Sequence, residues 1–502
     1  MSTQILLKNG TVLLHDAQNH VTATKTDVLI SNKTISKIEP NISDADIEAG
    51  MEVIDCTGKL ISPGFIDTHH HVWQSQLKGR HANQGLMQYM ASGRLLSNVF
   101  DPEDVFWGQL GGCMEMIDGG TTTVVDFAHG CHGKESNEAA ISATASSGIR
   151  SIYCYSPPLT VTSWDPFTLD QNSLTEDVFS NLSSLAKASP FGDGRITIGF
   201  AFDAFHFLPK QYLDMLMASL ASLPLITLHY CFGPTGNFSI PQAIESKGYL
   251  DHRFLIAHST NMPKEDVALY HEHGVHLSST PSTEMQMTMG GPVPAFDARY
   301  EGQNVRELCS LGVDCHSNNS AYLPGEARMA LQNARGQRSQ AFLDAGKQTR
   351  STGDYTVEEA FNQATIREAR AAKMGDSIGS VAVGKRADLV IFDVTSPAMI
   401  CGAVKDPVAA VVLHSSPADI DMVIADGIVR KRGGKLLLVD LDDNGKQIAK
   451  GRSQLAWRDV AKRLLASQEK LEKKLVGIDF GKAEIGLMEA WHIDPATVVD
   501  SI

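Results

Sequence analysis

Eight short apolar runs, separated by helical patterns, are the feature that most limits how this chain can fold. They lie between residues 61 and 378 and have the length of buried strands: GFIDTHHHV, TTTVVDF, RSIYCYS, ITIGFAF, LITLHY, FLIAHS, VHLSST and CSLGVDCHS. Strands that alternate with helices are typical of repeated β/α units and a parallel sheet. Eight such units in one stretch predict an α/β fold, a (β/α)8 TIM-like barrel, whose active site lies at the C-terminal ends of the strands.

The two ends of the chain differ from this middle. Residues 1–60 contain β-branched runs broken by Asn-Gly, Asn-Lys and Thr-Gly turns, and GKRADLVIFDV and IDMVIADGIVRKRGGKLLLVD repeat that texture near the C-terminus. Such runs predict short antiparallel strands. We therefore predict a small composite β-sandwich domain from residues 1–60 and 379–445, beside a metal-binding barrel at 61–378. Residues 446–502 are predicted to form a helical extension with an amphipathic helix from Arg452 to Lys474. This helix could pack on the barrel or on a second copy of the chain in a homodimer.

Composition limits the classes of partner and compartment. The chain has 502 residues, a formal net charge of −15 and a sequence pI of about 5.6. Nucleic acids and anionic membranes need a basic surface, so neither is expected as a partner, and a small-molecule substrate is. No secretory signal is visible and no apolar run approaches the ~18 residues of a membrane span, so we expect a cytoplasmic protein. Eight scattered cysteines without a C-x-x-C pair are expected to be reduced thiols.

Three consecutive histidines end the first strand of the predicted barrel. Alternate side chains of a strand share a face, so His69 and His71 point the same way and His70 points the opposite way. Three further candidate ligands end the fifth, sixth and eighth predicted strands, namely His229, His258 and Asp314. Imidazoles and a carboxylate that converge at the mouth of a barrel make a site for zinc or iron(II).

The ordered motifs PGFIDTHHH, LHY, IAHS, GVDCHSNN and IGSVAVGKRADLVIFD resemble those of the amidohydrolase superfamily. The branch that they resemble most is that of the cytosine, guanine and triazine deaminases and dechlorinases, and the resemblance covers nearly the whole chain. It implies one divalent metal ion, zinc first, with iron(II) or manganese as alternatives. The implied ligands are His69, His71, His229 and Asp314. The resemblance also implies that His258 lies beside the metal-bound water and orients it or polarises the substrate.

The function predicted on this basis is that of a metal-dependent hydrolase. It would break a C–N bond (amide, lactam or amino group) of a cyclic or aromatic small molecule through a metal-activated water. Asp314 is the strongest acid–base candidate, because a carboxylate in this position can accept the proton of the water and return it to the leaving group. The predicted catalytic residues are therefore Asp314 and His258.

One position departs from the deaminase pattern. That branch carries a glutamate three residues after the histidine of the fifth strand, whereas Phe232 stands at this distance from His229. Phenylalanine cannot transfer a proton, so simple aminopyrimidine or guanine deamination is the activity that it disfavours most. Asp314 and His258 would suffice for an amide or lactam. The alternatives are an amidohydrolase-fold lyase or dehydratase that uses the same metal site, and a non-catalytic family member.

Several residues near the strand ends are candidates for binding the substrate. Trp73 and Gln74 follow the histidines and could stack on, and hydrogen-bond to, a flat molecule. Glu284, after the seventh strand, could replace the missing glutamate, and His258 would be a further contact. The fourth strand is followed by two more candidates for the barrel mouth, Asp203 and His206. The sequence does not name the substrate, because specificity lies in the loops.

Overall fold

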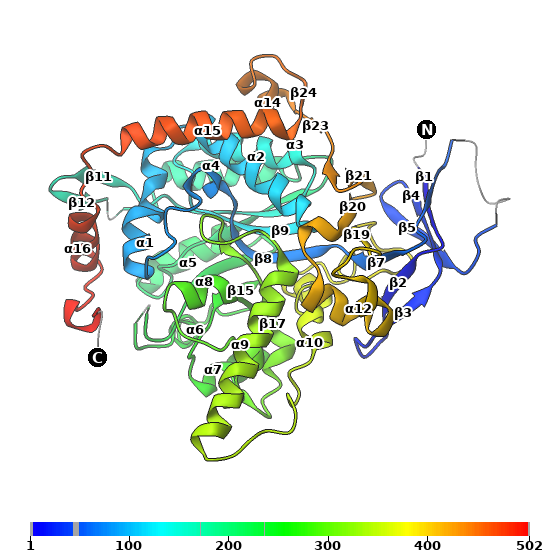
Figure 1. The fold of residues 1–502 in the computed structure, drawn as a ribbon. Coiled ribbons are helices and arrows are strands. Elements are labelled where there is room, and N and C mark those ends of the chain that lie inside the picture. The colour runs from blue at the N-terminus through cyan, green and yellow to red at the C-terminus, as the bar shows by residue number, and fades with distance from the viewer. Residues whose placement is uncertain (1–3, 44–49, 171, 235, 500–502) are drawn as a thin grey trace.

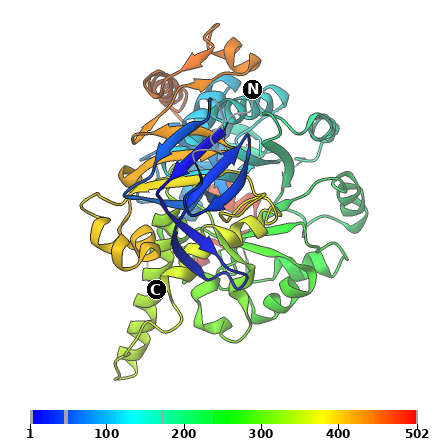
Figure 2. The same ribbon diagram turned by 90° about the vertical axis from the view of Figure 1, so that its right-hand side faces the viewer.

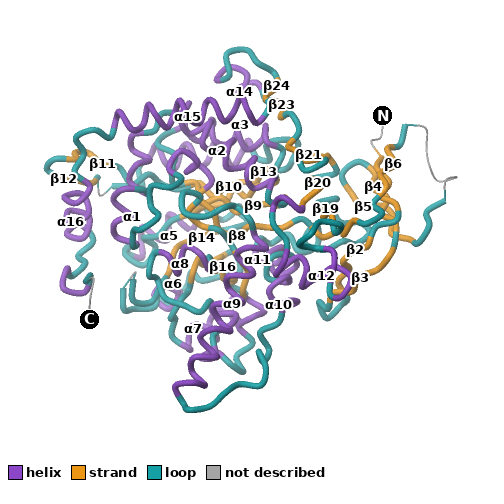
Figure 3. The backbone as a smooth tube through the Cα atoms, in the orientation of Figure 1, coloured by secondary structure: helices purple, strands orange, loops and turns teal. Residues whose placement is uncertain are grey.

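Strands at the centre of the molecule are surrounded by helices, and smaller sheets lie at one end (Figures 1 and 3). This arrangement is seen in a computed structural model, which describes residues 4–43, 50–170, 172–234 and 236–499. Within these residues, no helix is both long enough and apolar enough to cross a membrane.

The central strands form the predicted parallel barrel. In sequence order they are β8 (Phe65–His71), β9 (Thr121–Ala128), β10 (Arg150–Tyr155), β13 (Ile196–Ala201), β14 (Ile226–Tyr230), β15 (Phe254–His258), β16 (His276–Ser279), β17 (Cys309–Leu311) and β18 (Asp314–Cys315). The eighth predicted strand is divided in two: β17 pairs with β16, and β18 pairs with β8. These two pairings close the barrel between its last and first strands.

Gly312 lies at the division of the eighth strand and allows a close approach to β8. A Cβ atom on Gly312 would lie 2.5 Å from the carbonyl oxygen and 2.8 Å from the backbone nitrogen of His69. Asp314 then adopts a left-handed backbone conformation, with φ of 67°. His258, at the end of β15, has φ of 72°. Strained backbone of this kind in residues other than glycine gathers at functional sites.

Helices cover the outside of the barrel and follow most of its strands. They are α1 (Leu86–Ser92), α2 (Pro102–Asp118), α3 (Lys134–Ser147), α4 (Glu176–Ala188), α5 (Lys210–Ser219), α6 (Ile240–Glu245), α7 (Lys264–His273), α8 (Pro281–Gln286), α9 (Leu323–Asp344), α10 (Val357–Asn362) and α11 (Ile366–Ala371). Side-chain caps fix several helix starts. The Asp101 carboxylate accepts the Asp104 N–H at the start of α2, and the Thr356 hydroxyl accepts the Glu359 N–H at the start of α10.

Strands from the two ends of the chain form two further sheets, which Figure 2 shows in front of the barrel. One sheet has the order β5-β4-β1-β6 and the other β22-β21-β20-β19-β7-β2-β3. Their bounds are β1 (Gln4–Lys8), β2 (Thr11–His15), β3 (Val21–Lys25), β4 (Asp27–Ser31), β5 (Thr34–Glu39), β6 (Glu52–Asp55), β7 (Lys59–Pro63), β19 (Leu389–Asp393), β20 (Ile420–Ala425), β21 (Ile428–Arg432) and β22 (Lys435–Leu436). Because β7 pairs with β19, the second sheet needs both chain ends. The predicted fold class, a TIM-like barrel with a β-sandwich built from both ends, is confirmed.

The remaining C-terminal elements pack on the barrel helices. They comprise α12 (Ile400–Lys405), α13 (Pro407–Ala409), the hairpin β23 (Val439–Asp440) and β24 (Gln454–Leu455), α14 (Asp443–Ile448), α15 (Trp457–Lys474) and α16 (Phe480–Ala490). The predicted amphipathic helix thus begins at Trp457, and it lies along α2 (Figure 1). The hydroxyl of Ser467 in α15 donates to the Asp104 carboxylate at 2.7 Å. Helix α16 lies beside α1 and beside the hairpin β11 (Val161–Trp164) and β12 (Phe167–Leu169).

Candidate metal centre

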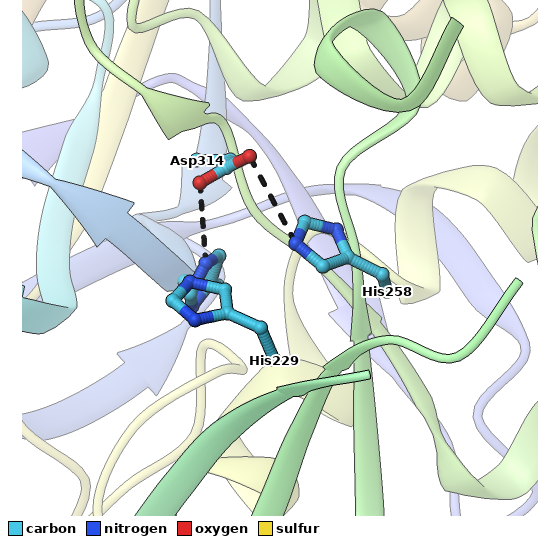
Figure 4. A group of neighbouring side chains, drawn as sticks. His229, His258 and Asp314 are labelled. Atoms are coloured by element: carbon cyan, nitrogen blue, oxygen red, sulfur yellow. Dashed lines mark ion pairs between the residues drawn. The ribbon is translucent and has the colours of Figure 1, made fainter. Parts of the chain in front are cut away.

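Four histidines and one aspartate meet at the C-terminal ends of the barrel strands. His69 and His71 come from β8, His229 from β14, His258 from β15 and Asp314 from β18. Oδ1 of Asp314 lies 2.9 Å from Nε2 of His71 and 3.2 Å from Nε2 of His69. Figure 4 shows the other oxygen, Oδ2, facing His258, whose Nε2 is 4.0 Å away. One ligand atom from each of His69, His229, His258 and Asp314 lies within 4.8 Å of the others.

This donor set fits a divalent cation. Both ring nitrogens of His69 and Oδ1 of Asp314 are buried without a hydrogen-bond partner among the described residues. A buried polar atom left unpaired costs about 1–3 kcal/mol. A cation that bound one ring nitrogen of His69 together with Oδ1 of Asp314 would remove that cost for these two atoms. Burial lowers the pKa of His69 well below its ordinary value, which keeps the imidazole in the unprotonated form that binds a metal. Burial alone would raise the pKa of Asp314, but the His69 and His71 imidazoles outweigh it and hold the pKa well below its usual range.

Hydrogen bonds on the far side of two rings orient them toward this centre. His71 Nδ1 donates to the carbonyl oxygen of Phe127 at 3.1 Å, and His229 Nδ1 lies 2.9 Å from Oδ1 of Asp203. Metal-binding histidines usually donate their second N–H to a carbonyl or carboxylate, which leaves the other nitrogen for the cation. Asp203, predicted only as a residue of the barrel mouth, thus orients His229.

His258 is oriented by the buried carboxylate of Glu284. Its Nδ1 lies 3.0 Å from the Thr280 hydroxyl and 3.3 Å from Oε1 of Glu284. Glu284 is 1% exposed, and the same oxygen accepts the Thr280 N–H at 2.8 Å. Burial lowers the pKa of His258, but the Glu284 hydrogen bond and the charge of Asp314 outweigh it and raise the pKa above its ordinary value. The structure therefore places Glu284 behind His258, where it positions the imidazole.

His70 points away from the candidate ligands. Its Nδ1 lies 2.7 Å from Oδ2 of Asp67, and its Nε2 lies 2.9 Å from Nδ1 of His316. Nε2 of His316 is in turn 3.2 Å from the Glu115 carboxylate of α2. Asp67, His70, His316 and Glu115 thus form a continuous row of polar contacts. This row connects β8 to the segment after β18 and to α2. His70 thus has hydrogen-bond partners on both ring nitrogens that do not involve the centre.

The structure places Trp73 and Gln74 in the interior, with 1% and 0% of their surface exposed. Both belong to the 3-10 segment Val72–Leu77 that follows β8. The Trp73 indole N–H donates to Nδ1 of His129 at 3.2 Å, and the Gln74 amide donates to the Tyr89 hydroxyl at 2.7 Å. Both side chains are thus hydrogen-bonded to neighbouring residues, and their contact with a substrate stays a prediction.

The segment after β14 carries no carboxylate at the third position beyond His229. Phe232 is partly buried and packs against the main hydrophobic core, and its N–H donates to the carbonyl oxygen of Thr260 at 3.1 Å. His206 lies in the loop after β13, where its ring lies against that of Phe207, with 3.9 Å between centroids and an interplanar angle of 44°. The structure does not bring His206 into the group of candidate ligands.

Three neighbours of the site were missed in the sequence. His129 directly follows β9, is 1% exposed, and has its ring centroid 3.8 Å from that of His71. Arg94 is buried, and its Nη1 donates to the carbonyl oxygen of His129 at 3.0 Å. Cys315 places its sulfur within 4.8 Å of ligand atoms of His71 and Asp314. His129 and Cys315 had a signal in the sequence, because His129 follows a strand of the barrel and Cys315 follows Asp314 at the end of another.

Comparison with known proteins identifies the family. Residues 60–429 match the amidohydrolase family. The chain belongs to this family. A 5-methylthioadenosine/S-adenosylhomocysteine deaminase of Acetivibrio thermocellus is 27% identical over 414 residues, which cover 79% of this chain and 88% of that protein. A 5'-deoxyadenosine deaminase of Methanocaldococcus jannaschii is 27% identical over 436 residues, which cover 84% of this chain and 94% of that protein.

Solved structures of the amidohydrolase fold resemble the whole molecule. An adenosine deaminase from Xanthomonas campestris with bound zinc has a TM-score of 0.70 and 19% identity, and the match covers 92% of this chain and 99% of that one. An atrazine chlorohydrolase from Arthrobacter aurescens complexed with zinc has a TM-score of 0.72 and 18% identity, over 93% and 99% of the two chains. At this identity the likeness supports the fold. The predicted family and enzyme class, an amidohydrolase-type hydrolase acting on C–N bonds, are confirmed.

Proposed function

We propose that this member of the amidohydrolase family is a zinc-dependent hydrolase that breaks a C–N bond of a cyclic or aromatic small molecule. The observation that carries the proposal is the convergence of His69, His71 and His229 on Asp314. Imidazoles with one carboxylate suit zinc, and zinc is bound in two of the similar solved structures. The relatives named as deaminases support a substrate whose reacting carbon bears nitrogen.

The side chains divide the chemistry between them. Zinc, when bound, supplies Lewis acidity and lowers the pKa of a water molecule from about 15.7 to about 7. The Asp314 carboxylate accepts a proton and returns it to the leaving nitrogen. His258, held by Glu284, faces Oδ2 of Asp314 through Nε2 and serves as the second proton-handling group. The buried Glu284 keeps His258 in that orientation and does not itself contact the substrate.

Phe232 favours the hydrolysis of an amide-like C–N bond. Hydrolysis of an amide or lactam needs a proton on the leaving nitrogen, which Asp314 and His258 provide. Deamination of a ring amine also needs support for the ring nitrogen beside the reacting carbon. The carboxylate that gives this support in the deaminase pattern is replaced by Phe232, and Glu284 is engaged behind His258. A ring amine is therefore a substrate only where another group contacts that nitrogen.

The test is turnover and metal content measured on the same preparations. The zinc-loaded enzyme is assayed for ammonia release and ring opening on aminopurines, aminopyrimidines, aminotriazines and cyclic amides. Asp314→Asn should keep its zinc and lose turnover, whereas Asp251→Asn, at the opposite end of the barrel, should match the wild type. In water labelled with ¹⁸O, hydrolysis places the label in the product. A product with unlabelled oxygen would indicate the lyase alternative, and turnover retained in Asp314→Asn would refute the assigned role.

A further inference from the structure

His129 is held beside the candidate metal ligands by three separate contacts. Its carbonyl oxygen accepts from Nη1 of Arg94 at 3.0 Å, and its Nδ1 accepts from the Trp73 indole at 3.2 Å. Its ring lies against that of His71, with a centroid distance of 3.8 Å and an interplanar angle of 40°. Gly130, the next residue, has room for no Cβ, since that atom would lie 2.4 Å from Cδ2 of Trp73. The backbone and the ring of His129 are thus both fixed.

The contact with Trp73 determines which nitrogen of His129 carries the proton. An indole N–H is a donor only, so Nδ1 of His129 must present its lone pair to it. A hydrogen on Nδ1 would place two donors against each other across 3.2 Å. The ring is therefore the neutral tautomer with hydrogen on Nε2. This assignment follows from the geometry of the pair.

The Nε2–H group of His129 is available to a ligand. It has no hydrogen-bond partner among the described residues and, unlike the ring nitrogens of His69, is not among the fully buried unpaired atoms. The residue as a whole is 1% exposed. His129 is also absent from the groups of donor atoms that could share a cation. Because its ring lies on that of His71, His129 stands beside the candidate metal centre.

We infer that His129 is a neutral hydrogen-bond donor to an acceptor atom of the substrate, a carbonyl oxygen or an unprotonated ring nitrogen next to the reacting carbon. This inference rests on the function proposed above and narrows its substrate to molecules that carry such an acceptor. His129 keeps its proton throughout, so it can stabilise charge on that atom but cannot shuttle a proton to it. Removal of one such donor from an active site typically costs about 100-fold to 1000-fold in rate.

The tautomer can be measured without any substrate. In zinc-loaded protein labelled with ¹⁵N at histidine, the long-range ¹H–¹⁵N spectrum should show a protonated Nε2 and an unprotonated Nδ1 for His129. Trp73→Phe keeps an aromatic ring at position 73 but removes its N–H, so His129 should become a mixture of both tautomers. A proton on Nδ1 in the wild type, or a zinc-bound Nε2, would overturn the inference whether or not a substrate has been found.

Variants of His129 separate donation from simple packing. His129→Phe keeps a ring beside His71 without a donor, and His129→Gln restores an N–H group. With a compound that the wild type turns over, kcat/KM should fall about 100-fold in His129→Phe and recover about tenfold in His129→Gln. Both variants should retain the full zinc content. His276→Gln, at the start of β16 and thus at the opposite end of the barrel, is the matched control and should behave as the wild type.

Two results of this series would refute the inference. If His129→Phe lost its zinc, or if it matched the wild type in kcat/KM, His129 would be part of the metal support or a packing residue. If no compound is turned over, the proposed function fails independently of the inference on His129. The role of His129 is then tested by the binding of a probe molecule. The probe is then acetohydroxamate, a small metal-binding amide with a carbonyl acceptor. Its Kd should rise about tenfold in His129→Phe and stay unchanged in His276→Gln, and equal Kd values would overturn the inference.

Discussion

Replacing Glu326 by glutamine should remove a large pH dependence from the stability of this enzyme. Glu326 lies in the first turn of α9, is 3% exposed, and accepts the Ser282 N–H through Oε2 at 3.0 Å. Burial, opposed by this hydrogen bond and assisted by the charges of Asp67 and Glu284, raises its pKa from 4.5 to about 8. The folded protein therefore holds a proton on Glu326 at neutral pH.

The direction and size of this pH dependence follow from the difference in bound protons between the folded and unfolded states. Between pH 4.5 and about 8 the folded state carries a proton on Glu326 that the unfolded chain has lost, so stability must fall as the pH rises. The slope is about 1.4 kcal/mol per pH unit, or about 3 kcal/mol from pH 5.5 to pH 7.5. A glutamine side chain does not ionise in this pH range, so the stability of Glu326→Gln should not show this decrease with rising pH.

The measurement is urea unfolding of zinc-loaded wild type and Glu326→Gln at pH 5.5, 6.5 and 7.5, with equal metal concentration. The stability of the variant relative to the wild type should increase steadily with pH. Protonation of the metal ligands affects both proteins alike and cancels in this difference. Glu301→Gln, an exposed residue, controls for the loss of a surface charge and should follow the wild type. Parallel pH profiles of Glu326→Gln and the wild type would show that Glu326 is ionised in the folded state and would refute the reasoning.

Three further predictions concern the metal centre. Glu284→Gln should lower kcat about 10-fold to 100-fold without loss of zinc, because it weakens the orientation of His258, and steady-state kinetics with metal analysis would check this. Dialysis against a chelator should lower the melting temperature, and added zinc should restore it, because the buried ligand atoms of His69 and Asp314 lose the cation that they bind. An unchanged melting temperature would argue against the site. Gly312→Ala should destabilise the protein by about 1–3 kcal/mol and weaken zinc binding, since its Cβ would lie 2.5 Å from the His69 carbonyl oxygen; denaturation and zinc titration would reveal either effect.

Most of the barrel could be predicted because its pattern is local. Several strands are apolar at their start and carry polar residues at their end, as in Phe65–His71 and Phe254–His258. A short stretch of sequence therefore locates both the strand and the end that lines the barrel mouth. The period of two along a strand also separates His70 from His69 and His71 without any tertiary information. The β-sandwich was accessible for a similar reason, although only pairing such as that of β7 with β19 joins the two chain ends.

The positions of Trp73 and Gln74 could not be obtained in this way. Two glycines of α2 allow the segment after β8 to approach very closely: a Cβ on Gly108 would lie 2.2 Å from the Trp73 carbonyl oxygen, and one on Gly112 would lie 2.3 Å from that of Val72. This contact holds the segment against α2 and turns Trp73 inward. The residues involved are more than thirty positions apart in the sequence, and nothing in either stretch alone indicates the contact.

The sequence by itself determined the barrel, the family resemblance and the set of candidate ligands, because strand periodicity and strand ends are properties of neighbouring residues. Only the tertiary structure decided what the surrounding polar groups do. It placed Glu284 behind His258, Asp203 behind His229 and Trp73 behind His129. Such roles depend on which donor faces which acceptor across elements far apart in the chain. These distances arise only when the whole barrel has closed.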